Sequence, residues 1–394
     1  MRIPPKPPPT IRIVFVDIKK TGYNKKMINY LSAINPENIA GKTCLLRVDL
    51  NINTKTKEEM YRLDSTIPTI RFLQKLGCRI HIISHRGRPE GKDKKLSLRP
   101  FAKLLAKKVG SKVGFFPYCN PERREVQTKT QIVLFENLRF DFREEANDIN
   151  FAKELAGLGD IYINDAFAVS HRENASVCAI TKFLPFYGGL LLEKEIEHLE
   201  RAVKTYEPPL TLILGGIKIK DKGDIIKYFK EKANTILIGG GLANTFLKAR
   251  GEDVKNSIVD EVKDIKDYLL YNNILLPEDI KFHDNKILDI GPKTIQKFAN
   301  IISESKTIIW SGPIGMFEKH GYEKGTKGVW QAIIKNKTAF SLVGGGETTA
   351  SIKLVSDFGF RISDLRNLYI STGGGAMLDY LSGKTLPGIT ALNK

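Results

Sequence analysis

The feature that most constrains the fold of this chain is a unit repeated in its second half, in which a short apolar strand runs into glycine. Five segments have this form. They are 210–214 before Gly215-Gly216, 235–238 before Gly239-Gly240-Gly241, 307–310 before Ser311-Gly312-Pro313, Leu342-Val343 before Gly344-Gly345-Gly346, and 368–370 before Ser371-Thr372-Gly373-Gly374-Gly375. Alternating strands and helices predict a parallel sheet covered on both faces, with ligands bound beyond the carboxyl ends of its strands. Glycine lets the backbone approach a ligand closely, as a nucleotide and its phosphates require, although no GxGxxG or GxxxxGK[ST] pattern is present. Tight turns alone would explain one such glycine cluster, but they explain five poorly.

The first half repeats the alternation, but charged and polar residues follow its strands. The apolar pattern predicts strands at 44–48, 79–84, 132–135 and 161–163, and helices at 66–76, at 149–158 and around Leu98, Phe101, Leu104 and Leu105. After the strand ends come Asp49 and Asn51, His85 and Arg88, Arg139, and then Asn164, Asp165, His171 and Arg172. Arginine presents a planar fork of donors to carboxylate and phosphate oxygens, so several on one face favour a small polyanion over a long polymer. Any one of these residues alone is more often an ordinary surface charge, and only their recurrence at strand ends favours a binding site.

One segment, Leu342-Val343-Gly344-Gly345-Gly346-Glu347-Thr348-Thr349, joins a strand to the start of a helix. Thr348 or Thr349 is expected to cap this helix, so that backbone N–H groups point at one place and favour an anion. A carboxylate at Glu347 beside a polyphosphate requires a divalent cation between the two. Alternatively, Glu347 only complements the helix dipole. The segment alone leaves both interpretations open.

The length of 394 residues exceeds what one hydrophobic core supports, which predicts two domains. Residues 186–209 are expected to join them as a helix that Pro208-Pro209 ends. In this segment Leu192, Ile196, Leu199 and Val203 recur at helical spacing among Glu193, Glu195, Glu197 and Glu200.

Composition restricts the class of protein further. The formal charge of +18 comes largely from scattered lysines without the interleaved aromatic residues of a single-strand-binding groove, which favours a solvated surface over nucleic-acid binding. The widely spaced Cys44, Cys78, Cys119 and Cys178 fit neither a disulfide framework nor a zinc site, so a reducing compartment is expected. The chain contains no run of eighteen apolar residues, so no membrane span is predicted. Residues 1–26 begin with a proline-rich stretch, lack a signal-peptide cleavage site, and are interpreted as an extension of unknown purpose.

At this point the motifs match a known family. From about Lys42 to the C-terminus the chain resembles phosphoglycerate kinase. The resemblance is carried, in order, by Arg47-Val48-Asp49-Leu50-Asn51, Ser84-His85-Arg86-Gly87-Arg88-Pro89, Glu136-Asn137-Leu138-Arg139-Phe140, Asn164-Asp165-Ala166-Phe167, Gly215-Gly216-Ile217-Lys218, Asp289-Ile290-Gly291-Pro292-Lys293-Thr294, Trp310-Ser311-Gly312-Pro313, Gly344-Gly345-Gly346-Glu347-Thr348 and Ser371-Thr372-Gly373-Gly374-Gly375-Ala376. Nine motifs in the expected order are highly specific.

The resemblance implies an α/β fold of two Rossmann-like domains, each a parallel sheet flanked by helices, with a C-terminal segment that returns to the first domain. The implied divisions are an extension at 1–26, a 3-phosphoglycerate domain at 27–188, a connector helix at 189–206, a nucleotide domain at 207–375 and the returning segment at 376–394. The implied reaction is transfer of the acyl phosphate of 1,3-bisphosphoglycerate to ADP, which gives 3-phosphoglycerate and ATP with Mg²⁺.

The resemblance also implies roles for individual residues. Catalytic roles fall on Arg62, Lys218, Gly373 and Gly374, and metal binding on Asp221 and Glu347. Substrate contacts fall on Asp49, Leu50, Asn51, Arg62, His85, Arg86, Gly87, Arg88, Arg139, His171 and Arg172. Nucleotide contacts fall on Gly216, Ile217, Lys218, Lys222, Gly240, Pro313, Glu318, Gly345, Gly346, Glu347 and Thr348.

Elementary chemistry agrees with this division. Phosphoryl transfer asks a protein for alignment and for positive charge around the transferred oxygens rather than for covalent chemistry. Because the groups come from both halves, domain closure should assemble the site and exclude water, which would hydrolyse the acyl phosphate.

The chain departs from the family pattern at several positions. Glu347 stands where aspartate is usual, and its extra methylene would shift a magnesium ligand by more than about an ångström unless the backbone yields. The other departures are Ser311 for asparagine, Arg86 for leucine, Ile217 for a small residue and Met377 for serine. They bear on nucleotide affinity and rate more than on the identity of the reaction.

Two other function classes compete with this interpretation: a basic nucleic-acid-binding protein, and a catalytically silent relative kept for binding. The arginines at strand ends in one half argue against the first, and Arg62, Lys218 and Asp221 in their expected surroundings argue against the second. The remaining expectations are a cytoplasmic monomer that binds small-molecule substrates, with no nucleic acid and no membrane as partner.

Overall fold

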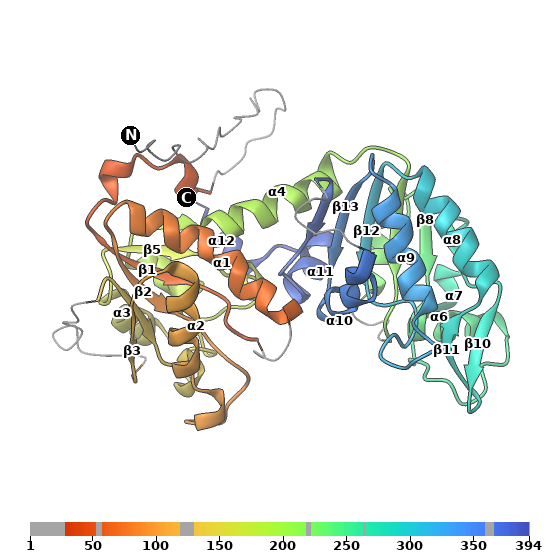
Figure 1. The fold of residues 1–394 in the computed structure, drawn as a ribbon, viewed down its shortest axis with the longest axis horizontal. Helices are drawn as coiled ribbons and strands as arrows, with labels where there is room; N and C mark the ends of the chain where they lie inside the picture. The colour runs from red at the N-terminus through yellow and green to blue at the C-terminus, as the bar shows by residue number, and fades with distance from the viewer. Residues whose placement is uncertain are drawn as a thin grey trace, which may run out of the picture.

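The computed structural model describes residues 28–52, 57–118, 130–217, 222–262, 265–358 and 366–393. The extension 1–26, together with Cys119, Lys218 and Asp221, lies outside the described residues. The chain forms two parallel sheets of six strands, each flanked by helices (Figure 1). The prediction of two Rossmann-like α/β units is therefore confirmed.

The first sheet has the strand order β3-β4-β2-β1-β5-β6, and every pairing is parallel. Its strands are β1 (Thr43–Arg47), β2 (Arg79–Ile83), β3 (Val113–Phe116), β4 (Ile132–Phe135), β5 (Ile161–Asn164) and β6 (Phe186–Gly188). The four predicted strands match β1, β2, β4 and β5 to within one residue at each end. The sequence did not indicate β3 or β6, because these edge strands of four and three residues are too short to set a pattern.

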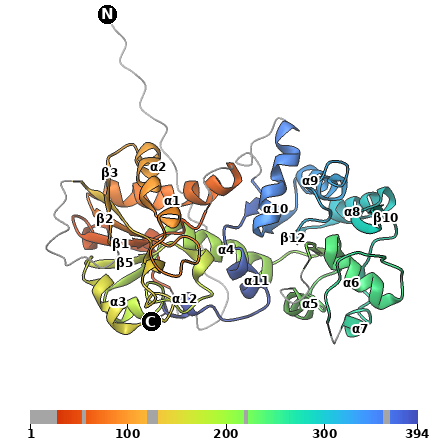
Figure 2. The same cartoon turned by 90° about the horizontal axis from the view of Figure 1, so that it is seen from below.

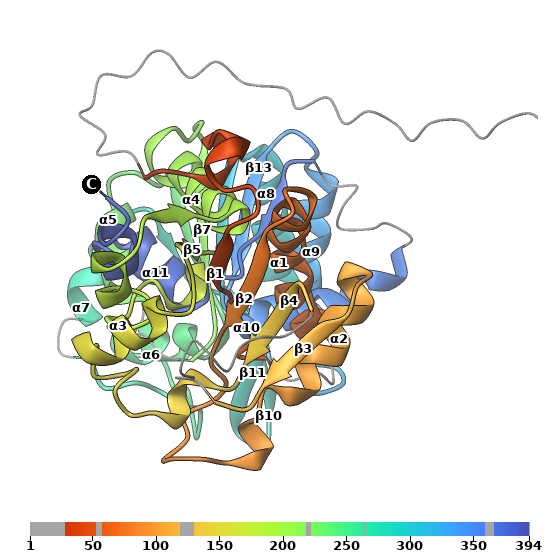
Figure 3. The same cartoon turned by 90° about the vertical axis from the view of Figure 1, so that its left-hand side faces the viewer.

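The two faces of this sheet pack against different helices, because successive side chains of a strand point to opposite faces. Leu46 packs in a core with α1 (Lys57–Lys75) and α2 (Arg99–Val109), whereas Leu45 lies in a core that includes α3 (Ile149–Ala156). Figure 3 shows α1 and α2 on one side of β1 and β2, and α3 on the other. Helix α1 begins nine residues before the predicted position 66, and only its first turn, Lys57-Glu58-Glu59, lacks an apolar residue to mark the helical period.

The second sheet has the order β14-β13-β12-β7-β8-β9, again with all pairings parallel. Its strands are β7 (Leu210–Leu214), β8 (Thr235–Ile238), β9 (Ile274–Leu275), β12 (Thr307–Ser311), β13 (Phe340–Gly344) and β14 (Leu368–Ile370). The helices around it are α5 (Gly223–Phe229), α6 (Gly240–Arg250), α7 (Ile265–Tyr268), α8 (Pro292–Glu304), α9 (Lys324–Lys335) and α10 (Gly346–Ala350), which continues as the 3-10 helix η8 (Ser351–Phe358). One face packs on α8 and α9 around the pair Trp310 and Trp330, whose ring centroids are 4.8 Å apart. The sequence did not indicate the antiparallel hairpin of β10 (Ile280–His283) and β11 (Lys286–Ile290), in which apolar and charged residues are mixed and most side chains are only partly buried or exposed.

A long helix, α4 (Leu190–Lys204), lies inside the predicted connector 186–209. One continuous apolar core includes its buried face, the α3 side of the first sheet, and α5 and α6 of the second. Figure 2 shows α4 and α11 (Gly375–Leu381) between the two sheets. After α11 the chain returns to the first domain: in α12 (Pro387–Thr390) the Gly388 N–H donates to the Ser170 carbonyl at 2.8 Å, and Asn393 forms an antiparallel bridge with Ile28.

The cysteines and helices add two observations. Cys44, Cys78 and Cys178 carry free thiols. None of the helices within the described part of the chain is long and apolar enough to cross a membrane.

Candidate active site

The carboxyl end of β1 and the first part of α1 bring Asp49 and Arg62 together. The Arg62 Nη1 lies 3.6 Å from the Asp49 Oδ2, and Arg62 remains partly exposed while Asp49 is buried. Asn51 is exposed next to this pair, and its side-chain oxygen accepts a hydrogen bond from the Gly87 N–H at 2.8 Å. Leu50 contributes its backbone, because its side chain is fully buried in the core.

A cluster of basic residues lies beyond the neighbouring strands. The Arg139 Nη1 donates to the Gly87 carbonyl at 2.7 Å, and its Nη2 lies 3.1 Å from the Glu145 carboxylate. Burial lowers the pKa of His85 well below its usual value, and the charges of Arg47, Arg139, Arg172 and Arg62 lower it further. Of these guanidinium groups, that of Arg47 contacts the buried imidazole directly, with its Nη2 3.2 Å from the His85 Nδ1. Arg88 is exposed at the same strand end.

His171 and Arg62 both reach the glycines at the start of α11, Gly374 as its N-cap and Gly375 as its first residue. A side-chain carbon placed on Gly375 would lie 3.5 Å from the His171 Nε2, and one on Gly374 would lie 3.7 Å from the Arg62 Nη2. The ring of Phe167 packs directly on Gly373. The predicted substrate residues of the first domain thus adjoin the predicted catalytic glycines of the second.

The glycine-rich strand ends of the second sheet pack backbone against backbone. The Gly216 N–H donates to the Pro313 carbonyl at 2.8 Å, and the Gly240 N–H donates to the Ile314 carbonyl at 2.7 Å. A side chain at Gly312 would collide with the backbone of Gly215, and Gly312 has φ of 93°, which disfavours other residues. These glycines therefore let the loops pack closely and form backbone hydrogen bonds with one another, and they also leave backbone accessible.

Lys222, directly before α5, and Glu347, in α10, both lie close to Gly216. A carbon placed on Gly216 would be 3.3 Å from the Lys222 Nζ and 3.9 Å from the Glu347 Oε2. Lys222 is buried, whereas Glu347 is exposed. Gly345 and Gly346 lie on the same strand-to-helix connection as Glu347.

The expectation that Thr348 or Thr349 caps this helix is wrong. The N-cap of α10 is Gly345, which makes no side-chain capping bond. Instead the Thr348 Oγ1 accepts from the Gly312 N–H at 2.7 Å, and the Thr349 hydroxyl donates to the Gly345 carbonyl at 2.9 Å. Thr348 is drawn to the neighbouring loop because that buried N–H needs an acceptor.

The loop between β12 and α9 carries the last predicted residues, Pro313 and Glu318. Pro313 is buried and Glu318 is exposed. The loop is held by Asp289, whose carboxylate accepts from the Gly325 N–H at 3.0 Å and from the Ile290 N–H at 2.9 Å. Burial raises the pKa of Asp289 to about 6. Ile217 is 47% exposed at the end of β7, so this departure from the family pattern faces the open side of the loop.

Two other departures from the family pattern have structural explanations. The Arg86 guanidinium points away from the basic cluster, donates to the Lys95 carbonyl at 3.0 Å and lies 5.5 Å from the centre of the Phe101 ring. The Met377 side chain is fully buried against Gly344 and occupies the space that a side chain there would need.

Sequence reasoning missed the burial of Glu195 behind the site, and it placed Asp165 at a strand end without identifying its partner. Glu195 on α4 is fully buried and accepts hydrogen bonds from the Ser371 hydroxyl and from both the N–H and the hydroxyl of Thr372. The Asp165 Oδ1 accepts from the Leu191 N–H at 2.8 Å, at the start of the same helix. A glutamate at a helical position reads as solvent-facing, so the sequence carries no signal for the burial of Glu195.

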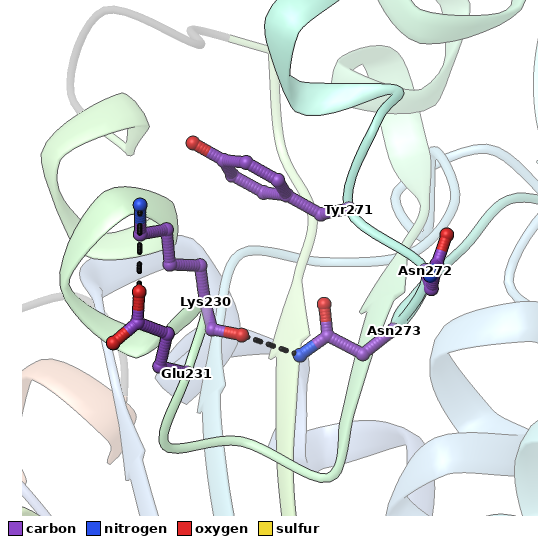
Figure 4. Close-up of a pocket in the computed structure, with 5 residues that line it drawn as sticks. All are labelled: Lys230, Glu231, Tyr271, Asn272 and Asn273. Carbon is purple, nitrogen blue, oxygen red and sulfur yellow. Dashed lines mark hydrogen bonds and ion pairs between the residues drawn. The ribbon is translucent and has the colours of Figure 1, made fainter.

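A separate surface hollow lies away from these residues. It measures about 390 Å³ and is lined by Lys230, Glu231, Tyr271, Asn272 and Asn273 (Figure 4). The Asn273 side chain donates to the Lys230 carbonyl at 2.9 Å, immediately before the amino ends of β8 and β9. The glycine-rich loops lie at the opposite, carboxyl ends of the strands, so this hollow is not part of the candidate site.

Comparison with known proteins places these observations in a family. The family model described as phosphoglycerate kinase matches residues 34–384. A phosphoglycerate kinase of Dictyoglomus turgidum is 39% identical over 391 residues, which is 91% of this chain and 97% of that protein. One of Wolbachia pipientis wMel is 39% identical over 388 residues, covering 90% and 96%.

Solved structures agree with the sequence comparison. Phosphoglycerate kinase from Coxiella burnetii has a TM-score of 0.78 at 32% identity, covering 93% of this chain and 99% of that one. The enzyme from Pyrococcus horikoshii OT3 has a TM-score of 0.80 at 30% identity, covering 92% and 98%. With a family match across most of its length and relatives that share its whole fold, this chain belongs to the phosphoglycerate kinase family.

Proposed function

We propose that this chain catalyses the reversible transfer of the acyl phosphate of 1,3-bisphosphoglycerate to ADP, which gives 3-phosphoglycerate and ATP in glycolysis. Family membership supports this reaction. The structural observation that carries it is that predicted substrate residues of the first domain adjoin glycines at one edge of the second sheet, next to the strand that leads to the predicted nucleotide residues. Arg62 and His171 lie beside Gly374 and Gly375 after β14, and the adjacent strand β13 leads to Gly345 and Glu347.

On the first-domain side, we assign the glycerate to Asp49 and Asn51 and the triose phosphate to the cationic cluster. That cluster consists of His85, Arg88, Arg139, His171 and Arg172, with the backbone of 86–87 beside it. Arg62 would face the transferred group, since its guanidinium lies between the Asp49 carboxylate and Gly374. A planar cation there stabilises the charge that spreads over the phosphoryl oxygens in the transition state.

On the second-domain side, we assign the nucleotide to the glycine-rich loops. Lys222 and Lys218 would meet its phosphates, Thr348 and the backbone at 345–346 would support them, and Glu318 would contact the ribose. The proximity of Lys222 to Gly216 supports this assignment. Lys218 and Asp221 lie outside the described residues, so their roles rest on the family motif.

The residues present fit a magnesium ion that arrives with the nucleotide. Among the described residues no group of three His, Cys, Asp or Glu side chains is placed to hold a metal alone. Mg²⁺ commonly binds through one or two carboxylates together with substrate phosphates. The exposed carboxylate of Glu347 beside Gly216 suits that arrangement, and Asp221 would be the second ligand. The ion would neutralise charge on the nucleotide phosphates.

Catalysis by groups from both domains requires the domains to close. We assign the domains to 27–188 and 207–375, with the connector at 189–206 and the returning segment at 376–394. The buried contacts of Glu195 with Ser371 and Thr372 support the connector as the element that transmits closure, because they join its middle to the residues before Gly373. Closure would align the reactants and keep water from the acyl phosphate.

We also propose that the chain acts as a cytoplasmic monomer on small-molecule substrates, without nucleic acid as a partner. Free thiols at Cys44, Cys78 and Cys178 are compatible with a reducing compartment. Sedimentation would test the monomeric state, and a nucleic-acid shift assay at physiological salt would test the absence of a nucleic-acid partner.

The decisive experiment is a coupled assay of ATP formation from 1,3-bisphosphoglycerate and ADP, run on the full chain and on a chain that begins at Met27. Both are expected to turn over. Lys218→Ala should lower kcat by about a thousandfold or more while circular dichroism is unchanged. The matched control is Lys230→Ala, which deletes a lysine that lines the separate surface hollow. This variant should keep normal turnover. A folded wild-type chain without turnover would instead favour a catalytically silent relative.

A further inference from the structure

Behind the basic cluster lies a buried hydrogen-bond network, of which only His85 has a role in the proposed chemistry so far. It consists of Arg47, Glu144, Ser176 and His85, each at most 2% exposed. The Arg47 Nε donates to the Ser176 hydroxyl at 2.9 Å, its Nη1 donates to the Val48 carbonyl at 2.6 Å, and its Nη2 lies 3.2 Å from the His85 Nδ1. Every branch of the Arg47 fork is therefore engaged.

Glu144 holds this fork from the other side. The Ser176 hydroxyl donates to the Glu144 Oε1 at 2.6 Å, and the Ser176 N–H donates to the Glu144 Oε2 at 3.0 Å. The same Oε1 lies 3.9 Å from the Arg47 Nη2. A buried guanidinium needs such a carboxylate because an uncompensated buried charge is strongly unfavourable. Glu144 and Ser176 together thus leave Arg47 one orientation.

That orientation decides where the proton of His85 resides. A guanidinium has only donors, so the hydrogen bond between Arg47 and His85 requires the His85 Nδ1 to accept. The ring is then neutral, and its single proton is on Nε2. The lowered pKa of His85, caused by burial and four neighbouring arginines, agrees with a neutral ring. Among the described residues no protein acceptor faces its Nε2.

The second histidine of the cluster has the opposite geometry. The Arg172 Nε donates to the His171 Nε2 at 3.2 Å, so this ring accepts at Nε2 and carries its proton on Nδ1. Burial and the charge of Arg172 lower the pKa of His171 as well. The two histidines therefore provide opposite tautomers in one molecule.

We propose that Arg47, oriented by Glu144 and Ser176, is a positioning residue that fixes His85 as the neutral tautomer with its proton on Nε2. His85 then donates a hydrogen bond to a bound anion without taking up a proton, and the arginines alone carry the positive charge of the cluster. The identity of that anion, 3-phosphoglycerate, rests on the proposed function; the tautomer does not.

The direct test is a long-range ¹H–¹⁵N correlation spectrum of the full chain labelled with ¹⁵N-histidine at neutral pH. The chain has six histidines, so the spectrum is simple, and His85→Gln and His171→Gln identify the two sets of signals. His85 should show an unprotonated Nδ1 and a protonated Nε2, and His171 the reverse. Added 3-phosphoglycerate should shift the His85 Nε2 signal and leave Nδ1 unprotonated. A His85 imidazolium, or a proton on its Nδ1, would overturn the proposal without any variant.

Variants test the positioning role. Arg47→Met should convert His85 to a tautomer mixture and raise the KM for 3-phosphoglycerate about tenfold, as expected for one directed hydrogen bond, with the KM for ATP unchanged. Glu144→Gln should act in the same direction. Arg143→Gln is the control: Arg143 lies next to Glu144 in the chain, but its guanidinium pairs with Asp141 and Glu154. This variant should change neither the His85 tautomer nor the KM for 3-phosphoglycerate. A single unchanged His85 tautomer in a folded Arg47→Met protein would refute the role of Arg47.

The two proposals fail separately. A wild-type spectrum with the expected tautomers but no turnover would reject the proposed function and leave the histidine assignment standing. Normal turnover with the wrong His85 tautomer would do the opposite. If Arg47→Met does not fold, the wild-type spectrum still decides the tautomer, and Glu144→Gln decides the positioning role of the network.

Discussion

Replacing Glu195 by alanine tests whether the connector helix is tied to the catalytic glycines by its buried carboxylate. Glu195 is fully buried and accepts the Ser371 hydroxyl at 2.7 Å, the Thr372 N–H at 2.6 Å and the Thr372 hydroxyl at 2.7 Å. The alanine variant leaves these three donors facing an apolar gap. The hydroxyl groups can rotate toward other acceptors, but the Thr372 N–H cannot.

The expected loss follows from these contacts. Hydrogen bonds to a charged group contribute about 1.5–3 kcal/mol each, so three would give roughly 5–9 kcal/mol if they were additive. The actual loss is smaller, because burial raises the pKa of Glu195 and its removal relieves that desolvation cost. We expect a decrease of about 3 kcal/mol in the free energy of unfolding.

Urea unfolding followed by circular dichroism measures this change, and the coupled assay measures turnover. Glu197→Ala is the matched control, because Glu197 is exposed two residues away on the same helix; it should cost no more than about 0.5 kcal/mol. Turnover of Glu195→Ala should fall as well, since Ser371 and Thr372 directly precede Gly373. A loss no greater than that of Glu197→Ala, with normal turnover, would refute the reasoning.

Three further predictions use other parts of the site. Arg62→Gln should lower kcat by about a hundredfold or more in the coupled assay, because it removes the cation that lies between Asp49 and Gly374; a change only in the KM for ATP would contradict this placement. Glu347→Asp should retain or improve activity in a Mg²⁺ titration, since it restores the aspartate that the resemblance implies for the proposed metal ligand, and loss of ATP formation would show that the metal is misplaced. The pKa of Asp289 is raised to about 6 in the folded state, against about 4 in the unfolded state. The folded state therefore binds the Asp289 proton more tightly. The free energy of unfolding should then fall as pH rises from about 4 through about 6, by at most about 3 kcal/mol. Asp289→Asn should flatten this part of the curve in urea unfolding, whereas Asn at the exposed hairpin residue Asp284 should not.

Much of the sheet architecture followed from local pattern. Apolar runs such as Ile132–Phe135 and Leu210–Leu214 are buried on both faces in a parallel sheet, so they contain no alternation to misread and their ends are sharp. The hairpin β10–β11 and the edge strand β3 did not follow, because partly exposed strands lack such a run. The cap assigned to Thr348 failed because the hydroxyl bonds a loop 36 residues away, which a local rule cannot anticipate.

By itself, the sequence determined the alternation of the central strands with helices, the residues at the ends of those strands, and the motifs of the phosphoglycerate kinase family. Only the tertiary structure decided which of those strand ends meet. It placed Arg62 and His171 beside Gly374 and Gly375, and it buried Glu195 and Glu144 where their helical or loop positions suggested solvent. The physical reason is that periodicity reports how a segment faces its own core, whereas the environment of a buried charge is set by partners distant in sequence, which become neighbours only when the domains pack.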